Sequence, residues 1–161
     1  MASLESLCTL AQAFPTFAHQ ALDFLVDMFN DEIQEIRLKA IQCLTKISKG
    51  NIILREDQMD IILAVLEDFS MDIREALHLM IGNCKLASKN ALRSTINNLM
   101  ENLKRYPGDK DSIWTCFQKL GKNNVNLTLS LVPEILSLHP FLKVPELPLE
   151  NPECKWFLLV V

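Results

Sequence analysis

The heptapeptide DEIQEIR at residues 31–37 recurs as DFSMDIR at residues 68–74, with the aspartate, the second isoleucine and the arginine in register. The same shift of 37 residues carries Leu44 onto Ile81, so the apolar pattern recurs together with the polar one. A fixed period of about 20–50 residues is typical of repeat proteins, in which each unit packs only on its neighbours. The sequence therefore predicts stacked repeats and not a globule around one central core.

Each repeat is predicted to be a pair of helices. Apolar residues recur at the i, i+3, i+4, i+7 spacing of an amphipathic helix, and single prolines or glycines separate the periodic stretches. A third, weaker copy, at a slightly longer offset, places Ile113 in the position of Ile73. The pattern predicts about eight helices, the first over residues 3–14 and the eighth over residues 124–138. The expected fold is an all-α, HEAT- or armadillo-type solenoid of antiparallel helix pairs.

Several of these helices are apolar on more than one face. Ile61 and Val65 lie off the main apolar face of the fourth helix, and Val125 and Leu129 begin a second row on the eighth. A helix between two neighbours needs two apolar faces, and we therefore expect these second rows to be covered by adjacent repeats.

The polar residues of the repeated heptapeptide are the candidate site. Asp31, Arg37, Asp68 and Arg74 flank the turns between paired helices, at matching height in adjacent repeats. One interpretation is a ladder of Asp–Arg pairs that joins neighbouring repeats. The other is that they are solvated turn residues, each of which contributes little to stability.

The chain divides at residue 138 into the helical repeats of residues 1–138 and a segment of different character. Residues 139–161 hold four prolines and end in an apolar run, which predicts an irregular, proline-rich tail. A solenoid usually closes with a repeat whose outer face is polar. The apolar end therefore suggests a truncated piece, an alternative product or a short paralogue of a longer protein.

Composition narrows the class of protein. Hydrophobic residues make up 49% of the chain and charged residues 22%, a globular balance. The longest apolar runs, residues 61–66 and 156–161, are too short to cross a bilayer, and the first residues lack the basic flank of a secretory signal. The five cysteines are widely separated along the chain and form no C-x-x-C pair. We expect an intracellular protein with reduced thiols buried between helices.

The sequence holds no recognisable catalytic, metal or cofactor site. Its four glycines do not form a phosphate-binding loop, and His19, His78 and His139 are far apart. His19 and Asp23 share a helix face at i, i+4, but no third ligand follows, which favours a surface pairing over a metal site. We therefore expect a protein that is not an enzyme and uses no cofactor.

Four segments carry a resemblance to a known family: residues 4–15, 33–40, 74–78 and 97–106. Over residues 1–138 the chain resembles the HEAT region of the Integrator complex subunit 4 family. The resemblance implies a nuclear scaffold in a complex that processes the 3′ ends of small nuclear RNAs and attenuates transcription by RNA polymerase II. It also implies two nuclease partners, Integrator subunits 9 and 11, although no individual binding residue carries over.

Two other functions remain open. One is a nuclear-transport or trafficking adaptor built on the same repeats. The other is direct RNA binding, which the charge disfavours because residues 76–161 carry only 10 basic against 7 acidic side chains. The basic residues that such binding would use are Lys85, Lys89, Arg93, Lys104, Arg105, Lys110, Lys119 and Lys122.

Overall fold

The computed structural model of the chain describes residues 2–48 and 53–138. Within these residues the chain forms eight α-helices, three short 3-10 helices and two strands of two residues each. In chain order the elements are α1 (Ala2–Ala13), α2 (Pro15–Asp27), η1 (Met28–Asn30), α3 (Gln34–Ser48), β1 (Ile53–Leu54), α4 (Glu56–Ala64), η2 (Val65–Glu67), α5 (Met71–Asn83), β2 (Lys85–Leu86), α6 (Lys89–Arg105), η3 (Pro107–Asp109), α7 (Lys110–Asn123) and α8 (Val125–Leu138).

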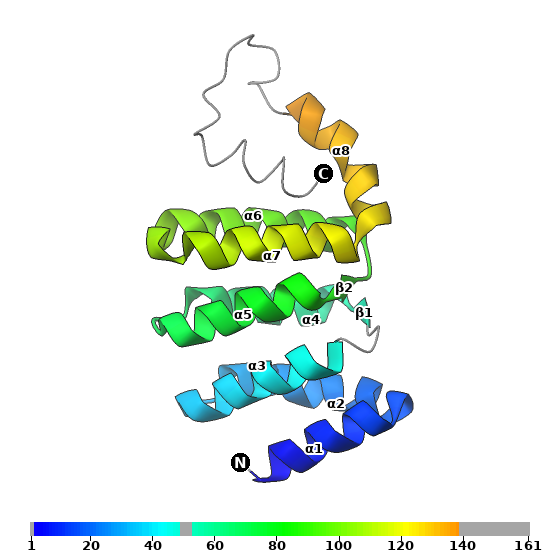
Figure 1. Cartoon of the computed structure of the whole chain (residues 1–161), viewed down its shortest axis with the longest axis vertical. Coiled ribbons are helices and arrows are strands. Elements are labelled where there is room, and N and C mark those ends of the chain that lie inside the picture. The colour runs from blue at the N-terminus through cyan, green and yellow to red at the C-terminus, as the bar shows by residue number, and fades with distance from the viewer. Residues whose placement is uncertain (1, 49–52, 139–161) are drawn as a thin grey trace.

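The helices form two layers (Figure 1). The nearer layer in that view contains α1, α3, α5 and α7, each packed on the next, and the layer behind it contains α2, α4 and α6. α8 packs against α6 and α7. The pairs α2–α3, α4–α5 and α6–α7 are called here the first, second and third repeats. This stack confirms the predicted all-α solenoid of HEAT or armadillo type.

The core is a continuous apolar layer of side chains between the two layers of helices. Leu44 of α3 and its counterpart Ile81 of α5 are both fully buried, as are Leu25, Ile62 and Phe117. Burial of each such side chain stabilises the fold by roughly 1.5–3 kcal/mol. The repeat period therefore places equivalent side chains at equivalent depth in successive repeats, as the sequence predicts.

The boundary between α1 and α2 differs from the prediction. The sequence places Phe14 on the apolar face of a first helix over residues 3–14, but α1 ends at Ala13 and Phe14 is 58% exposed. Its backbone is extended, with φ −127° and ψ 103°, and it precedes Pro15 at the start of α2. A proline disfavours helical backbone at the residue before it, which explains the break.

The prediction of second apolar faces holds for α4 and is wrong for the described part of α8. Val65 is 7% exposed, and Ile61 packs partly on the core. In contrast, Val125 and Leu129 are 51% and 60% exposed, because α8 turns Leu131 toward the core instead.

The sequence did not predict the two short strands. β1 and β2 follow the first and second repeats and pair in parallel, with Ile53 opposite Lys85 and Leu54 opposite Leu86. Stacking brings these linkers side by side at matching height. Two residues are too few to show the alternation that identifies a strand in sequence.

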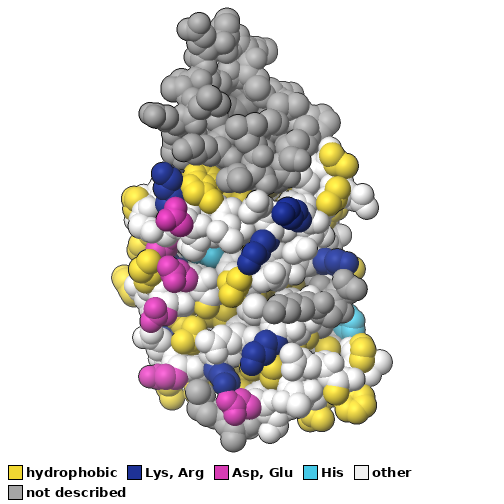
Figure 2. All heavy atoms as spheres, in the orientation of Figure 1, with side chains coloured by type: hydrophobic (Ala, Val, Ile, Leu, Met, Phe, Trp, Pro, Cys, Tyr) yellow, Lys and Arg dark blue, Asp and Glu magenta, His cyan; other side chains and the backbone are white. Residues whose placement is uncertain are grey.

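Four of the five cysteines, Cys8, Cys43, Cys84 and Cys116, are free thiols buried in the described part of the fold, as predicted. Cys154 and the predicted tail of residues 139–161 lie outside the described residues. Within residues 2–48 and 53–138, no helix has the length and apolar character that a membrane span requires. On the face that α1, α3, α5 and α7 present, most acidic side chains gather along one border, which also carries a basic side chain near its upper end, and other basic ones lie across the middle and the opposite side (Figure 2).

Candidate functional site: a polar ladder along the turns

The turns of the first two repeats share one local structure. The backbone N–H of Asp31 donates to the carbonyl of Met28, and that of Asp68 donates to the carbonyl of Val65. Each aspartate then accepts, through Oδ1, the N–H of the residue two positions on, at 2.8 Å in both turns. An aspartate side chain that bonds the backbone two residues ahead stabilises a turn, which explains why the same residue type recurs there.

The arginine of each repeat folds back onto its own turn. Arg37 Nη1 donates to the carbonyl of Asp31 at 2.9 Å and to that of Glu32 at 3.3 Å. Arg74 Nη1 makes the same two contacts one repeat later, with the carbonyls of Asp68 at 2.9 Å and Phe69 at 3.0 Å. Each guanidinium therefore satisfies carbonyls that the short turn leaves without helical partners.

The same arginines also reach the next repeat. Arg37 Nη2 lies 3.0 Å from Asp68 Oδ2, with the two side chains 18% and 13% exposed. Arg74 makes a two-point contact with Asp109: Nε lies 2.6 Å from Oδ2, and Nη2 lies 3.1 Å from Oδ1. These side chains are only 7% and 2% exposed, and the hydrogen bonds to Asp109 raise the pKa of Arg74 above its usual value.

Asp109 was missed by sequence reasoning. The step from Asp68 to Asp109 is longer than the step from Asp31 to Asp68, and so a fixed period does not reach it. The third copy also carries Trp114 at the position that corresponds to Arg74. The available signal was an aspartate directly after Pro107-Gly108, a turn between two helices.

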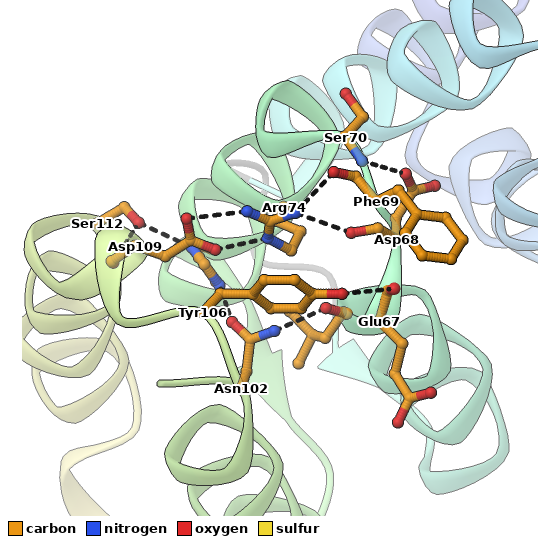
Figure 3. Close-up of polar contacts among 11 residues, drawn as sticks. Glu67, Asp68, Phe69, Ser70, Arg74, Asn102, Tyr106, Asp109 and Ser112 are labelled. Atoms are coloured by element: carbon orange, nitrogen blue, oxygen red, sulfur yellow. Dashed lines mark hydrogen bonds and ion pairs between the residues drawn. The ribbon is translucent and has the colours of Figure 1, made fainter. Parts of the chain in front are cut away.

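Tyr106 covers the Arg74–Asp109 ion pair, which joins the second and third repeats (Figure 3). The guanidinium carbon of Arg74 lies 3.8 Å from the centroid of the Tyr106 ring, which is a cation–π contact. The Tyr106 hydroxyl donates to the carbonyl of Glu67, at 3.2 Å. The ring thus holds the arginine in place and joins the end of α6 to η2.

His78 extends this network into the core, where it is 1% exposed. Its Nε2 lies 3.0 Å from Asn102 Oδ1, and Asn102 Nδ2 donates to the carbonyl of Leu66 at 2.6 Å. Because the Asn102 oxygen faces the ring, the neutral imidazole carries its proton on Nε2. Nδ1 lies 2.9 Å from Ser112 Oγ, and that hydroxyl also donates to the carbonyl of Asp109 at 2.8 Å. Burial lowers the pKa of His78 to about 4, so the ring is uncharged at neutral pH.

Asparagines join the repeats at the opposite end of the helices. Asn124, which is 6% exposed, donates to the carbonyl of Cys84 at 3.0 Å and accepts the N–H of Leu86 at 2.8 Å. Its neighbour Asn123 donates to the carbonyl of Gly82, also at 2.8 Å. The stack is therefore hydrogen-bonded at both ends of the second and third repeats.

The chemistry of these residues is that of a structural site. Burial raises the pKa of the Cys84 thiol to about 12 and that of Cys43 to about 11, so both are protonated at neutral pH and are poor nucleophiles. In the described part of the chain, no group of three or more histidine, cysteine, aspartate or glutamate side chains is placed to hold a metal ion. We expected Asp23 to pair with His19, but Asp23 Oδ1 instead accepts hydrogen bonds from Arg55 and Gln58.

The basic residues considered for RNA binding do not form one surface. Arg93, Lys104 and Arg105 lie on α6 and Lys119 and Lys122 on α7, which belong to different layers. Arg105 is also engaged with Glu67, its Nη1 lying 2.7 Å from Oε1.

Comparison with known proteins identifies the family. No family model matches the chain. Among curated proteins, the chain is 51% identical over 152 residues to Integrator complex subunit 4 of Homo sapiens, a match that covers 94% of the chain and 16% of the relative. It is 44% identical over 160 residues to the Drosophila melanogaster protein of the same name, with 99% and 16% covered, and 37% identical over 138 residues to the Dictyostelium discoideum homologue, with 86% and 11% covered.

These relatives are all much longer, since the chain spans 16% of the length of the first two and 11% of the third. The matches nevertheless extend over most of this chain, and they confirm the resemblance that the sequence motifs indicated. With 51% identity over 94% of its residues, the chain belongs to the Integrator complex subunit 4 family.

Proposed function

We propose that this chain is a non-catalytic scaffold that binds other protein subunits of an Integrator complex in the nucleus. The observation that carries the proposal is the extent of the match: 51% identity across 94% of the chain, to a protein named as a subunit of that complex. The proposed biological setting is 3′-end processing of small nuclear RNAs and attenuation of transcription by RNA polymerase II. The proposed partners are the nuclease subunits, Integrator subunits 9 and 11. The proposed domain of helical repeats comprises residues 1–138.

The architecture supports a scaffold. Each repeat packs on its neighbours, which leaves the outer face of both helical layers available along the length of the stack. The proposed role of Asp31, Arg37, Asp68 and Arg74 is to fix the spacing of the repeats, because Arg37 contacts Asp68 and Arg74 contacts Asp109 of the next turn. A fixed spacing keeps a long protein-binding surface in one shape.

Co-precipitation tests the proposal directly. The full chain, carrying an affinity tag, is expressed in cells and recovered from nuclear extract, and the two Integrator nuclease subunits are detected by immunoblotting. We expect both subunits in the bound fraction, and we expect them to persist after nuclease treatment because the contacts are between proteins. Their absence, in an extract where tagged full-length subunit 4 recovers them, contradicts the proposal.

A direct measurement separates this function from RNA binding. If the basic residues bind RNA, the affinity for a single-stranded oligonucleotide falls steeply with salt, by roughly the 0.7 power of the salt concentration for each phosphate contact. We expect the full chain to bind a 20-nucleotide oligouridylate no better than bovine serum albumin does at 150 mM salt. Binding with a steep salt slope that is lost on substitution of Lys119 and Lys122 favours the RNA-binding alternative.

A further inference from the structure

An open groove of about 340 Å³ lies between α5 and α7. Glu75 and Leu79 form one wall, and Asp111, Thr115 and Lys119 form the other, spaced at i, i+4 and i+8 along α7. His78 and Ser112, joined by their hydrogen bond of 2.9 Å, lie in its lining. The polar network described above therefore also shapes this part of the surface.

The two helices approach each other closely at one end of the groove. At Gly82 of α5, an added Cβ atom would lie 3.2 Å from the Cβ of Lys119 and 3.3 Å from the Cα of Cys116. Glu75 and Asp111 lie nearer the beginnings of α5 and α7, away from this contact, at what is called here the acidic end of the groove. A ligand segment therefore has room beside the two carboxylates and is stopped by the close contact at Gly82.

The charge along the groove is polarised. Both carboxylates at the acidic end are exposed, and the acidic border in Figure 2 runs along this side of the face. The lining adds no compensating positive charge there, since His78 is neutral at neutral pH. The positive charge in the lining lies at the opposite end, on Lys119. The acidic end therefore attracts a cationic side chain.

Exposed apolar side chains accompany these charges. Leu79, in the groove wall, is 48% exposed. Phe69, in the turn that leads into α5, is 98% exposed, and Met71 at the start of α5 is 49% exposed. Leu79 therefore gives the acidic groove an exposed apolar wall, which is a feature of protein-binding sites, whereas Phe69 and Met71 lie outside the groove lining.

We propose that the groove between α5 and α7 docks a segment of a partner protein that presents lysine or arginine beside apolar side chains. The cationic side chains meet Glu75 and Asp111 at the acidic end, and the apolar ones pack on Leu79. The argument is charge complementarity together with the exposed apolar wall. It rests on the proposed scaffold function and specifies the surface and the kind of partner.

Fluorescence anisotropy with a defined probe tests the inference. The probe is a fluorescein-labelled nine-residue peptide of alternating arginine and leucine, titrated with the full chain at 50 mM salt. The Glu75→Gln/Asp111→Asn variant removes the carboxylates, and Thr115→Trp fills the groove without a change of charge. We expect Glu75→Gln/Asp111→Asn to bind the probe about tenfold more weakly, since two exposed ion pairs contribute about that factor together. Thr115→Trp should also weaken binding, because its indole occupies the space that the probe would fill.

A matched variant controls for diffuse attraction. Asp60 on α4 and Glu101 on α6 are exposed acidic residues of the other layer, so Asp60→Asn/Glu101→Gln changes the net charge equally away from the groove. We expect this variant to bind within twofold of the original chain. Thermal melting followed by circular dichroism checks that all variants are folded.

The inference is overturned if Glu75→Gln/Asp111→Asn and Asp60→Asn/Glu101→Gln weaken binding equally, if Thr115→Trp has no effect, or if the original chain fails to bind. It is also overturned if a probe in which glutamate replaces each arginine binds with the same affinity as the original probe. Sedimentation that detects a dimer abolished by Thr115→Trp would mean that a second copy occupies the groove, which also overturns it. Failure of the scaffold function remains distinguishable, because a chain can lose the nuclease subunits in co-precipitation and still bind this probe.

Discussion

Replacement of Asp109 by alanine tests the ladder most sharply, because it removes one partner of a buried ion pair. Arg74 and Asp109 are 7% and 2% exposed, and the contact is made by two atoms of each group. Loss of the carboxylate leaves a guanidinium buried without its counter-charge, which costs about 3–5 kcal/mol. The carbonyls of Asp68 and Phe69 still accept from Arg74, so we expect the lower end of that range.

Urea unfolding of the full chain, followed by circular dichroism, measures this loss. With a slope of roughly 2 kcal/mol per molar urea, a loss of about 3 kcal/mol lowers the midpoint by about 1.5 M. Glu67→Ala is the matched control, since it also removes a carboxylate that contacts an arginine between the same repeats. That pair, Glu67–Arg105, is 68% and 53% exposed, and its loss changes stability by less than about 1 kcal/mol.

A third variant, Arg74→Met/Asp109→Leu, separates the cost of an unpaired charge from the strength of the pair. Replacement of both groups by apolar ones leaves no buried charge, and we expect it to be more stable than Asp109→Ala. Hydrogen exchange adds a spatial test, because repeats contact only their neighbours. Protection should fall in α5–α7 before it falls in α2. Equal urea midpoints for Asp109→Ala and Glu67→Ala, within the error of the measurement, refute the reasoning.

Three other perturbations follow from the same contacts. Between pH 6.5 and 4 His78 becomes protonated in the unfolded chain but stays neutral in the folded chain, where its pKa is about 4. Acid therefore lowers the free energy of unfolding by up to about 3 kcal/mol, and His78→Gln should flatten that part of the pH profile of urea unfolding. Gly82→Ala places a methyl 3.2 Å from the Cβ of Lys119 and 3.3 Å from the backbone of Cys116, so α7 must move slightly, and we expect the melting temperature to fall by several degrees. Gly108→Ala meets nothing within 4 Å and should be neutral. Asn124→Ala leaves the Leu86 N–H without its acceptor, which should destabilise the fold by about 1–3 kcal/mol and speed hydrogen exchange at that amide; unchanged exchange would contradict the assigned bond.

The sequence was sufficient to predict the helices, the stacking of their pairs and the depth of most apolar residues. Those features depend on periodicity, which a window of one or two helices reveals, and on the repeat offset that carries Leu44 onto Ile81. The contact of Arg37 with Asp68 could also be proposed from the sequence, because the 37-residue shift aligns Asp31 with Asp68 and Arg37 with Arg74. Local patterns and fixed offsets thus account for the correct part of the prediction.

The part that failed depends on contacts between residues that no fixed period relates. His78 meets Asn102 of α6 and Ser112 of α7, two helices whose offsets from α5 differ. In sequence, His78 lies beside Leu77 and reads as a polar residue near an apolar face. In sequence, Asn124 similarly indicates only the start of a helix, although its side chain makes hydrogen bonds to the linker after the second repeat. Such bonds are specified by the height at which repeats stack, which is known only after the stack is assembled.

The apolar and polar contacts have different consequences for the shape of the stack. Side chains such as Leu44 and Ile81 are fully buried, but the hydrophobic effect is non-directional, so by itself it leaves more freedom for one helix to shift against the next. The contact between Arg74 and Asp109 allows no such shift, because two pairs of atoms must stay within hydrogen-bonding distance and the charges have little access to water. The pair therefore fixes how α7 lies against α5. The groove between these helices, with the hydrogen bond between His78 and Ser112 in its lining, takes its width from that same arrangement, so the buried ladder determines the shape of the exposed surface that we propose binds a partner.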